Sequence, residues 1–120
     1  MSSDISQVSF SEDVVEDVYG LSPAQEGMLL HTLREPSSGV FLLQKILPLK
    51  QHDVAPFLKA WQRVLDRHPV LRTSFHWEGL SKPVQVVHRG VELPVEHADW
   101  RGLPDLDRGQ RLKAFLRADR

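Results

Sequence analysis

The chain has 120 residues, enough for one domain or for part of one. Its formal net charge of −1 gives no electrostatic reason to expect nucleic acid or an anionic membrane as a partner. Cysteine is absent, which excludes a disulfide framework, a cysteine-based zinc site and a cysteine nucleophile.

We expect no signal peptide, because the first residues lack the basic start and the apolar core of one. The longest uninterrupted apolar run, Val40 to Leu43, is far shorter than the ~20 residues that a membrane span needs. We therefore expect a cytoplasmic protein.

Residues 1–17 are polar and acidic, with four carboxylates around Val14 and Val15. This composition favours a solvated linker, and a short docking element for another chain is the alternative. We expect residues 18–120 to form the folded part.

The segment Ser22-Pro23-Ala24-Gln25 predicts a helix start, since serine can cap, proline suits the first helical position and Gln25 completes a capping box. The helix should run to about Leu33. Residues 35–39 then turn the chain, and the apolar, β-branched segment 40–49 predicts a strand.

Asp53 is a candidate cap for a second helix, which Pro69 should end at His68. Residues 71–77 and 84–88 predict a β-hairpin, and residues 91–95 a further short strand. Asp105 or Asp107 is a candidate cap for a last helix, which should run through Ala118. The expected fold class is α/β, a mixed sheet with helices on one face.

Two segments resemble core motifs of the condensation domains of nonribosomal peptide synthetases. Residues 21–31, Leu-Ser-Pro-Ala-Gln-Glu-Gly-Met-Leu-Leu-His, are similar to the first motif. Residues 67–75, Arg-His-Pro-Val-Leu-Arg-Thr-Ser-Phe, are similar to the second. Their order and spacing also fit, and the resemblance covers residues 15–120.

The resemblance implies a chloramphenicol-acetyltransferase-like fold, in which two lobes enclose a tunnel. Upstream and downstream peptidyl carrier proteins deliver thioesters on phosphopantetheine arms, and an amine attacks one thioester to form a peptide bond. No cofactor would bind this chain directly, and its other partner would be the remainder of the condensation domain. The family's signature is His-His followed by Asp-Gly, and its second histidine is the key catalytic residue.

This sequence departs from the family because its six histidines are all isolated. We expect the chain to be the N-terminal part of the first lobe, truncated before the His-His motif and inactive alone. The alternatives are a related acyltransferase that makes an ester or uses coenzyme A, and a non-catalytic docking fragment.

Arg72 and His68 are the candidates for structural support of the catalytic loop. The resemblance suggests that Arg72 pairs with the aspartate of the absent signature, which would leave it without that partner here. For His68, a structural role near the helix end is favoured over general-base catalysis.

Gln25, Glu26 and Gly27 are candidate lining residues of the acceptor side of the tunnel, as the resemblance implies. A glycine at position 27 could leave room for the aminoacyl group, or it could allow close helix packing. A metal site is not expected, because no histidine pair has ligand spacing. Ser22 and Ser74 lie in no nucleophile motif, and the three tryptophans favour core packing over base stacking.

Overall fold

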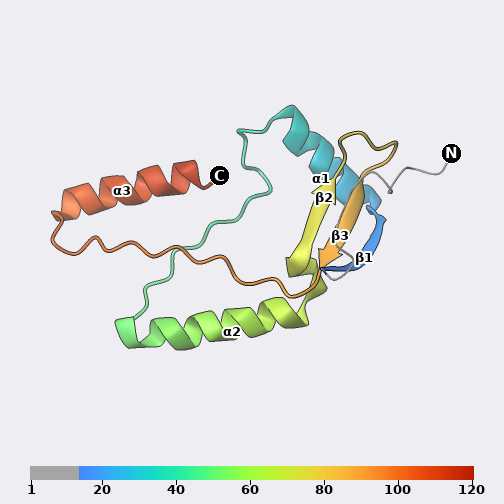
Figure 1. Ribbon diagram of the computed structural model, residues 1–120. Coiled ribbons are helices and arrows are strands. Elements are labelled where there is room, and N and C mark those ends of the chain that lie inside the picture. Colours follow the sequence, from blue (N-terminus) through green and yellow to red (C-terminus); the bar gives the residue numbers. More distant parts are fainter. Residues whose placement is uncertain (1–13) are drawn as a thin grey trace. The chain divides into compact units, whose positions relative to one another are not determined.

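A computed structural model describes residues 14–120 (Figure 1). These residues fall into two compact units, 14–27 with 49–93 and 28–48 with 94–120. The elements in chain order are β1 (Val15–Gly20), α1 (Pro23–Arg34), η2 (Gln51–Asp53), α2 (Val54–Arg67), η3 (Pro69–Arg72), β2 (Thr73–His76), β3 (Val84–His88) and α3 (Asp105–Ala118).

The first unit is built on a three-stranded antiparallel sheet in the order β1-β3-β2 (Figure 1). The central strand β3 holds most of the core, and its residues 84–87 are buried on both faces of the sheet. Val86 is the most deeply buried, with 1% of its surface exposed. The predicted hairpin is confirmed, but the prediction of a mixed sheet is wrong because every described strand pair is antiparallel.

Strand β1 was not predicted, and its first three residues lie in the expected linker at 1–17. The pairing of Val15 with His88 and of Asp17 with Val87 leaves Glu16 as an extra residue, which makes a β-bulge. Bulges redirect a side chain away from the regular alternation of a strand. The remainder of the expected linker, up to residue 13, lies outside the described residues.

Helix α1 begins with the predicted capping box. The Ser22 backbone N–H donates to Gln25 Oε1 at 2.8 Å, and the Gln25 N–H donates to Ser22 Oγ at 3.2 Å. This reciprocal pair satisfies two of the amide donors that a helix start leaves without intrahelical partners.

Helix α2 is amphipathic, and Leu65 on its apolar face is buried. Asp53 occupies the N-cap position as predicted, but its side chain makes no capping hydrogen bond. The helix ends at Arg67 because Pro69 disfavours helical geometry at His68, whose φ and ψ are −114° and 101°.

The Gln62 amide holds the chain that follows β3 along α2. Its Nε2 donates to the Val91 carbonyl at 2.9 Å, and its Oε1 accepts the Leu93 N–H at 2.8 Å. The predicted strand at 91–95 is therefore wrong: this backbone satisfies its polar groups on a side chain instead of a neighbouring strand.

The second unit contains helix α3 (Asp105–Ala118), which ends at Ala118 as predicted. Its N-cap position is Pro104 and no side chain caps it, so the prediction that Asp105 or Asp107 caps the helix is wrong. The strand predicted at 40–49 is wrong, because no strand among the described residues pairs with this segment. Gln44 Nε2 instead donates to the Leu116 carbonyl at 2.9 Å. The rings of Phe41 and His31 form a T-shaped pair whose centroids lie 5.5 Å apart. The expectation that helices cover one face of the sheet stays a prediction.

Segment 40–49 exposes much apolar surface, and we predict that it makes the chain self-associate. Light scattering over a range of protein concentrations should show dimers or larger species. The double variant Leu43→Ser/Ile46→Ser should shift the equilibrium toward monomer, since both side chains are more than half exposed.

Leu106→Ser is the matched control, because Leu106 is 73% exposed against 78% for Leu43 but lies on helix α3. A monomeric parent chain at every concentration would contradict the prediction. So would an equal response of the control and the double variant.

Candidate functional site

The Arg72 guanidinium is the centre of the most tightly organised polar site in the described residues. Arg72 ends the short helix η3 and is 8% exposed. Two of its bonds reach the last turn of α2, from Nε to the Leu65 carbonyl at 2.9 Å and from NH2 to the Asp66 carbonyl at 3.4 Å. Because the final carbonyls of a helix lack intrahelical partners, Arg72 acts as a side-chain cap of α2.

The NH1 nitrogen of Arg72 bonds to two strands of the sheet. It donates to the His88 carbonyl at the end of β3 and to Glu16 Oε2 in the bulge of β1, each at 2.6 Å. The β-bulge explains how Glu16 turns toward Arg72. One cation therefore ties the end of α2 to strands β1 and β3.

The Glu16 carboxylate is stabilised in its charged form. The hydrogen bond from Arg72 lowers the pKa of Glu16, the positive charges of Arg72 and Arg89 act in the same direction, and burial opposes them. The expectation that Arg72 lacks a carboxylate partner is therefore wrong, since Glu16 provides one. The loop-bracing role of Arg72 stays a prediction.

Gln25 is bonded into the first unit. Its side-chain amide pairs with that of Gln85 on β3, with Gln85 Nε2 donating to Gln25 Oε1 at 3.0 Å. Gln85 also donates to the Gly20 carbonyl at 3.0 Å. Through these bonds Gln25 anchors the start of α1 on the central strand, while its role in lining a tunnel stays a prediction.

Glu26 and Gly27 lie on the exposed surface of α1. A Cβ atom added to Gly27 would meet no heavy atom within 4 Å. No close contact among the described residues requires a glycine here, and its place beside the acceptor side of a tunnel stays a prediction.

A polar cluster that was not predicted lies on the Val86 face of the sheet. Ser74 Oγ lies 2.8 Å from His76 Nε2 and 2.6 Å from His88 Nε2. The predicted hairpin could have indicated this cluster. Ser74 pairs with Val86, and side chains two residues apart share a face of a strand, so His76 and His88 lie on the same face as Ser74. A single hydroxyl proton lets Ser74 donate to one imidazole while it accepts from the other.

Within residues 14–120, no three His, Asp or Glu side chains cluster as a metal site would require. No helix in this range is both long and apolar enough to cross a membrane.

Comparison with known proteins places these features in a family. Residues 15–120 match the condensation domain family. The chain belongs to this family. Both motif segments lie inside the match, so the residues around Arg72 and Gln25 are condensation-domain residues.

Three curated proteins illustrate the similarity of this condensation-domain chain to known synthases. Linear gramicidin synthase subunits B and D of Brevibacillus parabrevis are 47% identical over 89% of the chain and 48% identical over 88%. Tyrocidine synthase 2 of the same organism is 34% identical over 92%. The chain spans only 2% of each gramicidin subunit and 3% of the tyrocidine synthase.

His68 of the second motif lies directly after α2. Its N–H donates to the Val64 carbonyl and its own carbonyl accepts the Leu71 N–H, both at 3.0 Å. Its backbone thus joins α2 to η3, just before Arg72. Support of a catalytic loop by the His68 side chain stays a prediction.

We predict that Arg72→Ala lowers the free energy of unfolding of the chain by more than about 2 kcal/mol, because the buried and half-buried acceptors around this buried side chain lose their donor. The free energy of unfolding of Arg72→Lys should lie between those of the parent chain and Arg72→Ala, since lysine keeps the charge but loses the fork geometry. Denaturant midpoints measure both changes.

Arg101→Ala is the matched control, because Arg101 also pairs with a carboxylate, that of Asp99, but in an exposed position. Removing an exposed pair should change stability by no more than about 1 kcal/mol. Equal losses for Arg72→Ala and Arg101→Ala would contradict the structural role of Arg72.

The lowered pKa of Glu16 predicts an acid-sensitive contribution to stability. A depressed folded-state pKa adds stability above the unfolded value, about 4.3, and this stability is lost as pH falls through the folded value. Glu16→Gln should therefore lower the urea midpoint near neutral pH, and the difference from the parent chain should shrink below about pH 4.

Glu92→Gln is the control for this titration, because Glu92 is exposed and forms no ion pair with a described residue. Its effect on the urea midpoint should be small at every pH. A Glu16→Gln effect that stays constant from neutral to acid pH would show that the ion pair with Arg72 does not stabilise the fold.

Proposed function

We propose that this chain is the N-terminal part of the first, chloramphenicol-acetyltransferase-like lobe of a condensation domain that forms peptide bonds in nonribosomal peptide synthesis. The observation that carries the proposal is the family match over residues 15–120, which includes both motif segments. The identity of 47% to a gramicidin synthase subunit supports the same assignment.

In the proposed reaction, an acceptor amine attacks the carbonyl carbon of a donor thioester. A C–N bond forms, the C–S bond breaks and the thiol leaves, while the amine gives up a proton. The family's catalytic histidine belongs to a His-His pair, and this chain contains no such pair. Its own residues would therefore orient the site without moving that proton.

The bonds around Arg72 and Gln25 support such an orienting role. Arg72 is fixed through α2, β1 and β3. Within residues 14–120, its NH2 nitrogen makes one long bond, to the Asp66 carbonyl at 3.4 Å. In the proposed role, the NH2 nitrogen of Arg72 would donate to a carboxylate of the catalytic loop. His68 precedes Arg72 in the same motif segment. Glu26 and Gly27 would face the acceptor substrate, and Gln25 would hold their helix on β3.

The partners that this proposal requires are carrier proteins that present their thioesters on phosphopantetheine. The chain alone should form no dipeptidyl thioester from loaded donor and acceptor carriers. Product above a no-protein control would overturn that expectation.

The positive test is a chimera. Residues 15–120 replace the matching segment of an active condensation domain, and dipeptidyl thioester is measured by mass spectrometry. We predict that the chimera is active and that Arg72→Ala lowers its rate at least tenfold, about 1.4 kcal/mol of activation free energy.

Arg101→Ala in the chimera is the control and should leave the rate nearly unchanged, since this side chain is exposed. A folded chimera that makes no product would count against peptide-bond formation. Formation of an ester from a hydroxyl acceptor, without amide from an amine, would favour the related ester-forming class.

A further inference from the structure

The outer face of α2 carries a row of basic side chains. Lys59, Arg63 and Arg67 follow one another at intervals of four residues, and all three are exposed. Residues four apart on a helix lie on one face. The apolar residues Phe57, Trp61 and Leu65 occupy the opposite face, so the basic row is directed away from the apolar face of this amphipathic helix.

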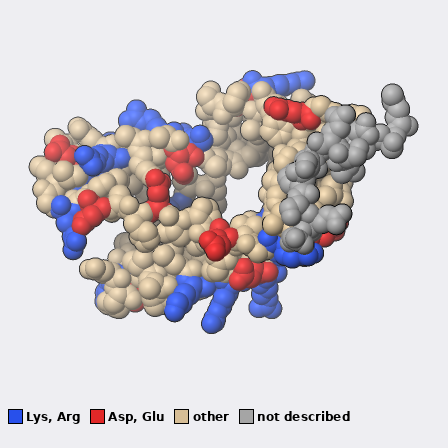
Figure 2. Space-filling view, in the orientation of Figure 1, with Lys and Arg blue, Asp and Glu red and all other residues tan. Residues whose placement is uncertain are grey.

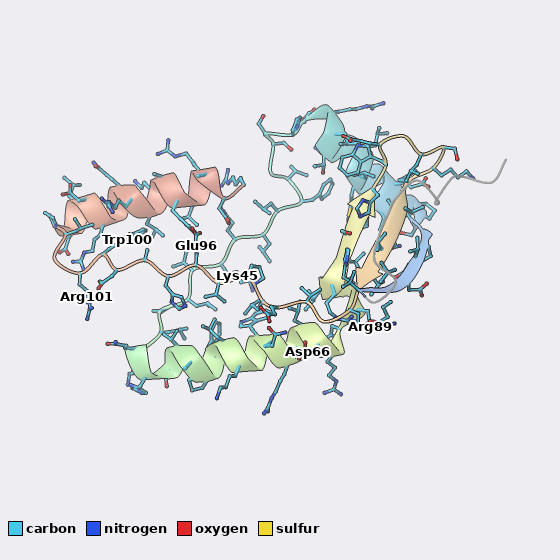
Figure 3. The ribbon with its side chains drawn as sticks, viewed as in Figure 1. Lys45, Asp66, Arg89, Glu96, Trp100 and Arg101 are labelled. Carbon is cyan, nitrogen blue, oxygen red and sulfur yellow. The ribbon has the colours of Figure 1, made fainter. Side chains whose placement is uncertain are left out.

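Figure 2 shows basic side chains grouped along the lower side of α2. None of these three forms an ion pair with another residue of the described range 14–120. Asp66, the single acidic residue of α2, is bonded to Gln62 Nε2 at 2.9 Å. Figure 3 labels it near the C-terminal end of the helix.

The spacing of the row is unfavourable for the helix, apart from Arg67, whose place in the last turn of α2 suits the helix dipole. Like charges four residues apart destabilise a helix, and both intervals of the row have this cost. Three basic residues and one acidic residue give α2 a charge of +2, whereas the whole chain carries −1. The row is therefore a local concentration of positive charge and not a consequence of a basic composition.

The surroundings of the row allow a second helix to approach. Pro56 and Ala60 lie on the same side of α2, and both are small and exposed. A helix rises 1.5 Å per residue, so successive cations are spaced by about 6 Å along the axis. Carboxylates at intervals of four residues on another helix have the same spacing.

We propose that the outer face of α2, defined as Lys59, Arg63 and Arg67 with Pro56 and Ala60, binds an acidic α-helix of a partner protein. The charge complementarity and the matched spacing carry this assignment. A nucleic acid fits less well, because domains that bind it are usually basic, with pI above about 9, whereas the sequence pI here is about 6.6. The inference goes beyond the proposed function and does not depend on it.

The test uses the full chain, ¹⁵N-labelled, and an alanine-based helical peptide of about 20 residues, long enough to be helical in water. The peptide carries three glutamates at intervals of four residues. We expect saturable shifts of amide signals confined to α2. They should disappear with the peptide in which glutamine replaces glutamate, and at about 1 M salt, where charges are screened beyond about 3 Å.

The triple variant Lys59→Gln/Arg63→Gln/Arg67→Gln should fold normally, since all three positions are exposed, and should bind the peptide about tenfold more weakly. The control Arg111→Gln/Lys113→Gln/Arg117→Gln removes the same charge from α3 and should bind like the parent chain. The variant in which glutamate replaces all three basic residues of the α2 row should no longer bind the glutamate peptide. It should instead bind a peptide with lysines at the same spacing.

Three outcomes would overturn the proposal. The first is the absence of saturable shifts in the parent chain. The second is an equal loss of binding for the α2 and α3 triple variants, which would reflect net charge alone. The third is tighter binding of a single-stranded oligonucleotide of matched charge, which would assign the face to nucleic acid. None of these outcomes bears on peptide-bond formation, which the chimera tests separately.

Discussion

A buried guanidinium has to be surrounded by acceptors, and this requirement organises the first unit. Arg72 draws the end of α2, the end of β3 and the bulge of β1 to one point. Elements that are distant in the sequence are thereby fixed relative to one another by one side chain. Its charge is balanced by a carboxylate that stays partly accessible to water, so the pair is not fully desolvated.

Side-chain amides have a similar organising role elsewhere in the same unit. Gln85 on β3 bonds to Gln25 and to the Gly20 carbonyl, and so anchors the start of the first-motif helix. Gln62 offers both a donor and an acceptor to the backbone at 91–93, as a neighbouring strand would. Both amides satisfy polar groups that would otherwise be costly to bury.

Local chemistry made part of the fold predictable. The capping box at Ser22 and Gln25, the stop at Pro69 and the alternating strands of the hairpin each depend on residues close in sequence. The predictions failed where the outcome depends on distant partners. Segment 40–49 has the composition of a strand but pairs with no described strand. The acidic residues of β1 favoured the prediction of a linker, although this segment pairs with β3. The Glu16–Arg72 pair joins residues 56 positions apart through a bulge, which no local pattern indicates.

The bulge at Glu16 has a consequence for the growth of the sheet. A three-stranded sheet has two outer edges, here formed by β1 and β2. A bulge interrupts the regular spacing of N–H and C=O groups and increases the local twist, so the β1 edge is a poor template for another strand. Strand β2 pairs with β3 without a register shift. Its outer edge is therefore the side on which a further strand, from this protein or another, would find an evenly spaced row of hydrogen-bonding groups.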